Sequence, residues 1–265
     1  MKKLLCCFCG LLVVTASVQA TPLFSDDFNG YANADLAGQG PWLQNGSSAV
    51  TPAQILNGRV LLGSSGQDLN APLSSPFALV DGTSFFIGAT INLSAANATG
   101  DYFLHWSPTT GSTIFISRVE ARSSGTGFQL GYVETSGTGA SLTWGTEELS
   151  FNQDYRIVLA YNVVAGPLND TANFYVNPSD TLVEANNTPY LSDTWNSVSA
   201  EVAALGAINL RQGTAANAPT LALDDLGVAT TFAEAATFTP VPEPTSLSIL
   251  GGFGLLACSL IRRRK

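Results

Sequence analysis

Two pairs of adjacent aspartates stand near the two ends of the central part of the chain. They are Asp26 with Asp27, and Asp224 with Asp225. Ca²⁺ prefers oxygen ligands such as carboxylates and takes about six to eight of them. Adjacent residues of a strand point to opposite faces, so at most one aspartate of each pair should face a common site. We expect these carboxylates to cap terminal strands, with a Ca²⁺ site as the alternative.

Glycoside hydrolysis is a second chemistry that carboxylates could supply. It needs two carboxyl groups about 5–10 Å apart across the scissile bond. Glu147 and Glu148 are adjacent and would point opposite ways on a strand, whereas Glu120 and Glu134 stand alone in separate segments. The spacing therefore predicts a protein that is not an enzyme, and a glycoside hydrolase-like, glycan-active enzyme is the alternative.

The chain has a single histidine, His105, which follows Asp101 by four residues. One histidine cannot complete a histidine-rich metal site. The Gly-x-Ser-x-Gly turn that would present a nucleophilic serine is also missing from the sequence. We therefore expect a strand histidine with a hydrogen-bond partner.

Four tryptophans supply aromatic surface. Aromatic rings suit the apolar face of a sugar, and amphipathic side chains suit a half-exposed site. A domain of this size also needs aromatic residues in its core, so at least two of the four should be buried. We expect Trp144, beside a glycine-rich loop, to be the best candidate for glycan stacking, with Trp106 as a second.

Short apolar runs recur along the middle of the chain, separated by Gly, Ser, Asn, Asp and Pro. Apolar residues alternate in several of them, as in a half-buried strand. This pattern predicts an all-β fold, an antiparallel sandwich or jelly roll, over residues 21–228. The predicted strands are 85–93, 102–106, 113–121, 128–133, 155–163, 172–176, 207–210 and 221–228.

Three segments resemble concanavalin A-like (laminin-G-like) jelly rolls. They are residues 24–31, the strand–turn–strand unit that starts at 155–161 and ends at 174–178, and residues 223–228. The resemblance implies that the first and last strands of the domain lie side by side. It would therefore bring the two aspartate pairs near each other.

Residues 1–20 have the features of a secretory signal peptide. Lys2 and Lys3 precede an apolar run, and small residues before Thr21 predict cleavage between Ala20 and Thr21. The predicted exported domain contains no cysteine, so its stability must come from burial without disulfides. The four cysteines lie in the two terminal segments: Cys6, Cys7, Cys9 and Cys258.

The C-terminal segment 242–265 has three parts. Pro242, Glu243 and Pro244 favour an extended, accessible backbone. Residues 245–261 are uncharged and, as a helix, would be about 26 Å long, just short of a typical bilayer core, which suits a temporary anchor. Positive charge favours the cytoplasmic side, which leaves the rest of the chain outside. Four consecutive cations close the chain: Arg262, Arg263, Arg264 and Lys265.

This order of parts resembles the PEP-CTERM sorting signal of Gram-negative bacteria. The resemblance implies processing by an exosortase near residues 242–244, after temporary anchoring in the inner membrane by the apolar helix. It also implies delivery to the cell envelope, the outer surface or the extracellular matrix, in association with exopolysaccharide. Residues 229–241 have few turn-forming residues and lead directly to this signal, so we expect a linker there, with one short helical turn at 232–236.

Charge is distributed very unevenly along the chain. Residues 21–241 carry five arginines, no lysine and 19 acids, a net charge of −14. Such a domain repels nucleic acid and anionic lipid. The sequence as a whole predicts an exported, non-enzymatic protein of the surface or matrix, with a structural or carbohydrate-binding role.

Overall fold

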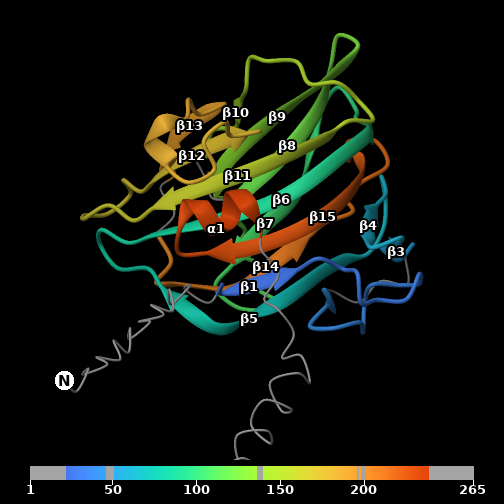
Figure 1. The fold of residues 1–265 in the computed structure, drawn as a ribbon, viewed down its shortest axis with the longest axis horizontal. Helices are drawn as coiled ribbons and strands as arrows, with labels where there is room; N and C mark the ends of the chain where they lie inside the picture. The colour runs from blue at the N-terminus through green and yellow to red at the C-terminus, as the bar shows by residue number, and fades with distance from the viewer. Residues whose placement is uncertain (1–21, 46–50, 136–139, 196, 198–200, 239–265) are drawn as a thin grey trace, which may run out of the picture.

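The structure of the chain is a computed structural model that describes residues 22–45, 51–135, 140–195, 197 and 201–238. These residues form two antiparallel sheets that pack face to face (Figure 1), which confirms the predicted sandwich. The predicted signal peptide with its cleavage site at Ala20 and Thr21, and the apolar segment 245–261, lie outside the described residues. Within the described part, no helix has the length and apolar character to cross a membrane.

The first sheet, sheet A, contains the strands nearest the viewer in Figure 1. β1 pairs antiparallel with β15, so the first and last strands lie side by side as the resemblance implied. In spatial order the strands are β13 (Leu191–Thr194), β12 (Thr171–Val176), β11 (Asp154–Asn162), β6 (Ser84–Ala95), β15 (Thr220–Ala229), β4 (Arg59–Leu62) and β3 (Gln54–Leu56), with β1 (Phe24–Asp26) beside β15.

The second sheet, sheet B, lies behind it and has seven strands. The pairing of β14 with β7 places Leu210 opposite Leu104 and Asn209 opposite His105, which fixes the face of each residue in the central strands. The strands are β10 (Thr143–Trp144), β9 (Gly127–Thr135), β8 (Ile116–Ser124), β7 (Asp101–Ser107), β14 (Ala204–Leu210), β5 (Asp68–Ala78) and β2 (Leu43–Asn45).

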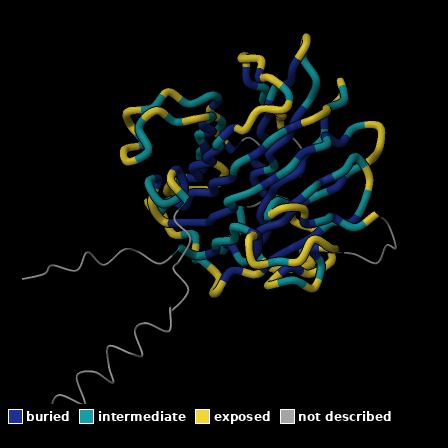
Figure 2. The backbone as a smooth tube through the Cα atoms, turned by 45° about the vertical axis from the view of Figure 1, so that its right-hand side comes forward, coloured by how far each residue is buried: buried dark blue, intermediate teal, exposed yellow. Residues whose placement is uncertain are grey.

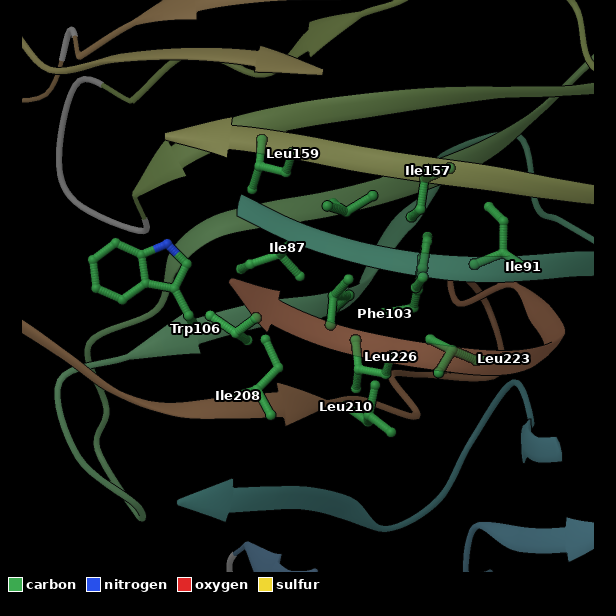
Figure 3. Packing of buried hydrophobic residues seen from close by; sticks show 14 of the residues in the cluster. Ile87, Ile91, Phe103, Trp106, Ile157, Leu159, Ile208, Leu210, Leu223 and Leu226 are labelled. Atoms are coloured by element: carbon green, nitrogen blue, oxygen red, sulfur yellow. The ribbon is translucent and has the colours of Figure 1, made fainter. Parts of the chain in front are cut away.

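The main core lies between the two sheets (Figure 3). Ile87 and Ile157 reach it from sheet A, and Phe103 and Ile208 reach it from sheet B. Figure 2 shows that the strands are mostly buried or partly buried and that the connections between them are largely exposed. Because alternate strand residues face this layer, the remaining residues of each strand lie on the outer face of its sheet.

A second, smaller cluster lies on the outer face of sheet A, under the helix α1 (Phe232–Thr237). The helix lies across β11, β6 and β15 (Figure 1). Its sequence segment was expected to be a linker from residue 229 onward, but β15 continues to Ala229 and α1 packs on the sheet. The residues of the cluster are Phe86, Val158, Ala160, Tyr175, Ala229, Phe232, Ala235 and Ala236.

Candidate functional site

The first aspartate pair binds groups of its own segment. One oxygen of the Asp26 carboxylate accepts hydrogen bonds from the Tyr31 hydroxyl at 2.6 Å and from Nε1 of Trp42 at 2.8 Å, and the other accepts from the backbone N–H of Phe28 at 2.8 Å. Burial raises the pKa of Asp26 above its ordinary value. Asp27 accepts from the N–H of Asn29 at 3.1 Å. This pair therefore stabilises the chain after β1, as strand-end capping predicts.

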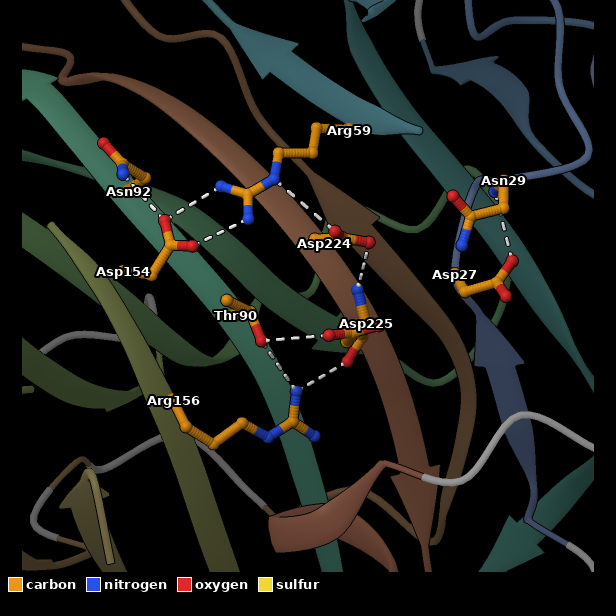
Figure 4. Close-up of polar contacts among 9 residues, drawn as sticks. All are labelled: Asp27, Asn29, Arg59, Thr90, Asn92, Asp154, Arg156, Asp224 and Asp225. Atoms are coloured by element: carbon orange, nitrogen blue, oxygen red, sulfur yellow. Dashed lines mark hydrogen bonds and ion pairs between the residues drawn. The ribbon is translucent and has the colours of Figure 1, made fainter. Parts of the chain in front are cut away.

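The second pair is bound by arginine (Figure 4). Oδ2 of Asp224 lies 3.5 Å from Nε of Arg59, whose guanidinium also forms a two-pronged contact with Asp154 at 2.7 and 2.8 Å. The hydrogen bonds from Arg59 and Asn92 lower the pKa of Asp154 to about 2. The guanidinium group of Arg59 therefore supplies the positive charge that Asp154 and Asp224 share.

A β-bulge in β15 turns both members of this pair to the same side. The register of β15 against β6 shifts between Asp224 and Gly227, and Asp225 takes a left-handed φ of 49°. Asp225 then accepts from the Thr90 hydroxyl at 3.3 Å on the outer face of sheet A. The expectation that neighbouring aspartates point to opposite faces is wrong here, because it assumes a regular strand.

These contacts leave little capacity for Ca²⁺. Asp26, Asp224 and Asp225 already accept hydrogen bonds or ion pairs from protein donors. Among the residues that the structure describes, no group of three or more His, Cys, Asp or Glu side chains is placed to hold a metal ion. The Ca²⁺ site on Asp26, Asp27, Asp224 and Asp225 stays a prediction without support from this geometry.

Trp106 is placed in the core and is fully buried. Its ring makes edge contacts with Phe85 at 5.3 Å and with Tyr161 at 5.6 Å between centroids. Alternation along β7 turns Trp106 inward and its neighbour His105 outward. The expectation that Trp106 stacks on a glycan is therefore not met in this fold. Trp42 and Trp195 are also buried, so the prediction of at least two buried tryptophans is confirmed.

Trp144 is half-buried and lies on the outer face of sheet B, beside Gly131 of β9. A Cβ atom at Gly131 would come within 2.6 Å of the indole, and one at Gly100 within 2.8 Å. The guanidinium carbon of Arg122 lies 4.4 Å from the ring centroid. Arg122 is itself held by two hydrogen bonds, of 2.9 and 3.2 Å, to Oε1 of Gln129. The indole is thus held in place on the sheet while part of it faces solvent.

A second aromatic centre on the same outer face is Tyr102. The guanidinium groups of Arg211 and Arg118 lie 4.2 and 5.0 Å from its ring centroid. Arg211 is paired with Asp101 at 2.6 Å and lies 3.9 Å from Asp68. Charged donors and acceptors therefore surround an aromatic ring.

Beside Tyr102, three polar residues form a row across neighbouring strands. Asn209 of β14 is directly opposite Asn70 of β5 on one side and His105 of β7 on the other. All three are buried, and in the described part of the chain neither ring nitrogen of His105 nor Oδ1 of Asn70 has a hydrogen-bond partner. Burial, reinforced by Arg211 and Arg118, lowers the pKa of His105 to about 3.

The expected hydrogen-bond partner of His105 is not found. Asp101, four residues earlier, pairs with Arg211. The register of β7 against β8 shifts twice between Tyr102 and Trp106, so the regular strand that the expectation assumed is not present. His105 instead contacts the rings of Phe115 at 4.8 Å and Tyr102 at 5.4 Å. Sequence spacing could find the histidine, but only the pairing of three distant strands shows the polar row to which it belongs.

One pair of carboxyl groups does meet across the two sheets. Burial, together with the charge and hydrogen bonding of Glu134, raises the pKa of Asp193 to about 6. The sequence placed Glu134 alone, since Asp193 follows it by 59 residues. Carboxyl groups in hydrogen-bond contact are closer than the separation of about 5 Å or more that glycoside hydrolysis uses. The pair therefore does not favour the hydrolase alternative.

Comparison with known proteins settles the nature of the C-terminal segment. Residues 240–265 match the model of the PEP-CTERM protein-sorting motif. The chain carries a PEP-CTERM sorting motif. This motif indicates an exported protein of a Gram-negative bacterium that is anchored in the membrane and then processed by an exosortase. The sorting residues Pro242, Glu243, Pro244, Arg262, Arg263, Arg264 and Lys265 all fall within the match and outside the described residues.

The sandwich is similar in fold to several solved structures. The CBM2 module of the evolved Dit of Lactobacillus casei BL23 phage J-1 has a TM-score of 0.50 and 10% identity, covering 79% of this chain and 95% of that one. The globular domain of T. cruzi calreticulin gives 0.49 and 10%, covering 92% and 100%. The carbohydrate recognition domain of Emp47p gives 0.47 and 11%, covering 81% and 100%. No relative is found among curated protein sequences. At these identities the likeness concerns the fold alone.

Proposed function

We propose that this chain is an exported, non-enzymatic protein that binds carbohydrate through the outer face of sheet B. Its place of action is the cell surface or the extracellular matrix, and its partner there is an exopolysaccharide. The observation that carries the proposal is the half-buried indole of Trp144, which contacts Arg122 and lies beside Gly131 and Gly100 while part of it faces solvent. A solvent-facing aromatic ring held by its surroundings is the feature that sugar stacking requires.

The same face supplies polar groups for sugar hydroxyls. Arg211 and Asp68 offer donors and acceptors beside the ring of Tyr102. Hydroxyl groups both donate and accept, so a face that mixes guanidinium and carboxylate groups suits a neutral saccharide. Trp144 would then provide stacking, and the charged side chains around the buried ring of Tyr102 would provide orientation.

The non-enzymatic part of the proposal rests on the carboxylates. Asp154 and Asp224 are bound to Arg59, and Asp26 is bound to Tyr31 and Trp42. A general acid and a nucleophile need two carboxyl groups on opposite sides of a bound sugar bond. The carboxylates named above are instead bound by side chains of the protein itself, which favours glycan binding over hydrolysis.

Binding of the full protein to a glycan array, and to exopolysaccharide from the bacterium that makes it, tests the proposal. We expect Trp144→Ala to weaken binding at least about tenfold, or about 1.4 kcal/mol. Leu182→Ala is the matched control, because Leu182 is an apolar side chain that is 72% exposed in the connection between β12 and β13, outside the strands of sheet B. Equal binding by wild type and Trp144→Ala would contradict the proposed face, and release of reducing sugar ends during incubation would contradict a purely binding role.

A further inference from the structure

The helix α1 is attached to the outer face of sheet A by apolar contacts. The Phe232 ring lies 5.3 Å from Tyr175 and 6.0 Å from Phe86, and Ala235 and Ala236 are buried beside it. The helix begins at Thr231, whose hydroxyl accepts from the N–H of Glu234 at 3.4 Å. A helix of six residues is not stable alone, so its form depends on these contacts.

Arg156 of β11 binds the C-terminal end of the helix. Its Nε donates to the carbonyl oxygen of Ala235 at 3.1 Å, Nη2 donates to the same oxygen, and Nη1 donates to the carbonyl of Asp225 at 2.8 Å. The Phe238 ring lies 5.8 Å from the guanidinium carbon. One half-buried side chain therefore joins sheet A to the last turn of α1.

The docked helix leaves a very short connection to the sorting motif. Three residues separate Phe238 from Pro242 in the sequence, and a connection of this length spans at most about 14 Å even when fully extended. The sandwich has a radius of gyration of about 17 Å, as expected for a domain of roughly 215 residues. With α1 docked, the bulk of the domain is held next to the segment that a membrane-embedded exosortase must reach.

Release of α1 would lengthen this connection about threefold. The chain from Ala229, the last residue of β15, to Pro242 spans up to about 45 Å when extended. Helix and contacts are lost together, because α1 has too few residues to persist alone. Docking of α1 therefore sets the length of free chain between the sandwich and residues 242–244.

We propose that α1 is a strap that limits access of the processing enzyme to the sorting motif, and that cleavage proceeds from molecules in which α1 has left sheet A. The peptide bond is broken by the exosortase, so this chain contributes presentation and no catalytic group. The inference rests on the sorting motif and on the contacts of α1. It does not depend on carbohydrate binding.

The test measures how fast the full-length chain is cleaved near residues 242–244 in the bacterium that makes it, by pulse-chase labelling and mass spectrometry. Insertion of nine Gly/Ser residues after Phe238 adds the length that release of residues 230–238 would free. Ala236→Glu places a charge in the buried contact and releases α1. We expect each to speed processing about tenfold or more, since a released minor state holds about 10% of molecules or fewer.

Thr237→Glu is the matched control, because Thr237 is on α1 but exposed, and it should leave the rate unchanged. Insertion combined with Ala236→Glu should be no faster than either change alone. The insertion leaves every contact of the sandwich intact, so it decides the question even where Ala236→Glu destabilises the fold. Unchanged processing of the insertion variant would overturn the proposal. If the insertion variant is processed at an unchanged rate but still binds glycan, the strap proposal fails while the proposed carbohydrate-binding function stands.

Discussion

His105 illustrates how one side chain depends on its surroundings. Its imidazole lies on the outer face of sheet B, in contact with Tyr102 and Phe115 and near the positive charges of Arg118 and Arg211. Burial and these charges both disfavour the protonated ring. The histidine is therefore neutral at physiological pH, and its two nitrogens offer one donor and one acceptor.

This environment predicts a loss of stability in mild acid. The pKa of His105 is about 3 in the folded chain and about 6.5 when unfolded. Below pH 6.5 the unfolded state takes up a proton that the folded state rejects, so the free energy of unfolding falls with pH until about pH 3. Urea unfolding at pH 7 and pH 4.5 should show a fall that is about 2 kcal/mol larger for wild type than for His105→Gln.

Carboxyl groups such as Asp193 act in the opposite direction, because a raised pKa favours the folded state at low pH. Their effect is common to wild type and His105→Gln and cancels in the comparison. Equal pH dependence in the two proteins would show that His105 is accessible to protons in the folded state.

Single residues could be assigned from the sequence only where a strand is regular. Trp106 and His105 are adjacent, and alternation predicts opposite faces, but it does not say which of the two faces the core. Asp224 and Asp225 fail the rule, because the bulge turns both to one side. The choice of face and the position of a bulge depend on pairing partners that are distant in the chain.

At the scale of elements, the short pairing of β10 with β9 positions Trp144. The indole lies where a side chain at position 131 would stand, so the edge of sheet B needs glycine there. Gly131 is not at a positive φ, which makes close approach the reason for glycine at this position.

Gly131→Ala should therefore displace the indole without unfolding the sandwich. The added methyl would lie 2.6 Å from the ring, and the ring can move outward because it is half-exposed. We expect glycan binding to weaken about tenfold, with a shift of tryptophan fluorescence. Gly111→Ala is a control at a position with open space around it, although its φ of 67° adds some strain. Glycan binding by Gly131→Ala at the wild-type level would show that the position of the Trp144 indole does not matter for binding.

The elements themselves were predicted where apolar runs are continuous. The central strands β6, β7, β9 and β11 coincide closely with the predicted runs. β5 was missed, because Pro72, Pro76 and two serines break its pattern. Its partner β2 covers only residues 68–70, and prolines are tolerated where a strand lacks a partner on one side. The helix α1 was expected as a short turn in a linker, since six residues do not reveal the surface on which they dock.

At the scale of the whole molecule, the sheet topology decides where the charged side chains lie. The five arginines of residues 21–241 all lie on the outer faces of the two sheets and contact carboxylates, carbonyls or aromatic rings. The remaining acids give the domain its net charge of −14. Fold class, sorting motif and charge could be predicted from local sequence. The outer face of sheet B that we propose to bind glycan could not be predicted, because it is assembled from strands that are far apart in the chain.

An exported domain between two removable ends is the central prediction for this chain. Mass spectrometry of the native protein, recovered from the envelope and matrix fractions, reads both termini directly. We predict a mature chain that begins at Thr21 and ends near residues 242–244, without Arg262 to Lys265. Recovery of the mature population from the cytosol with residues 1–20 still attached would contradict it.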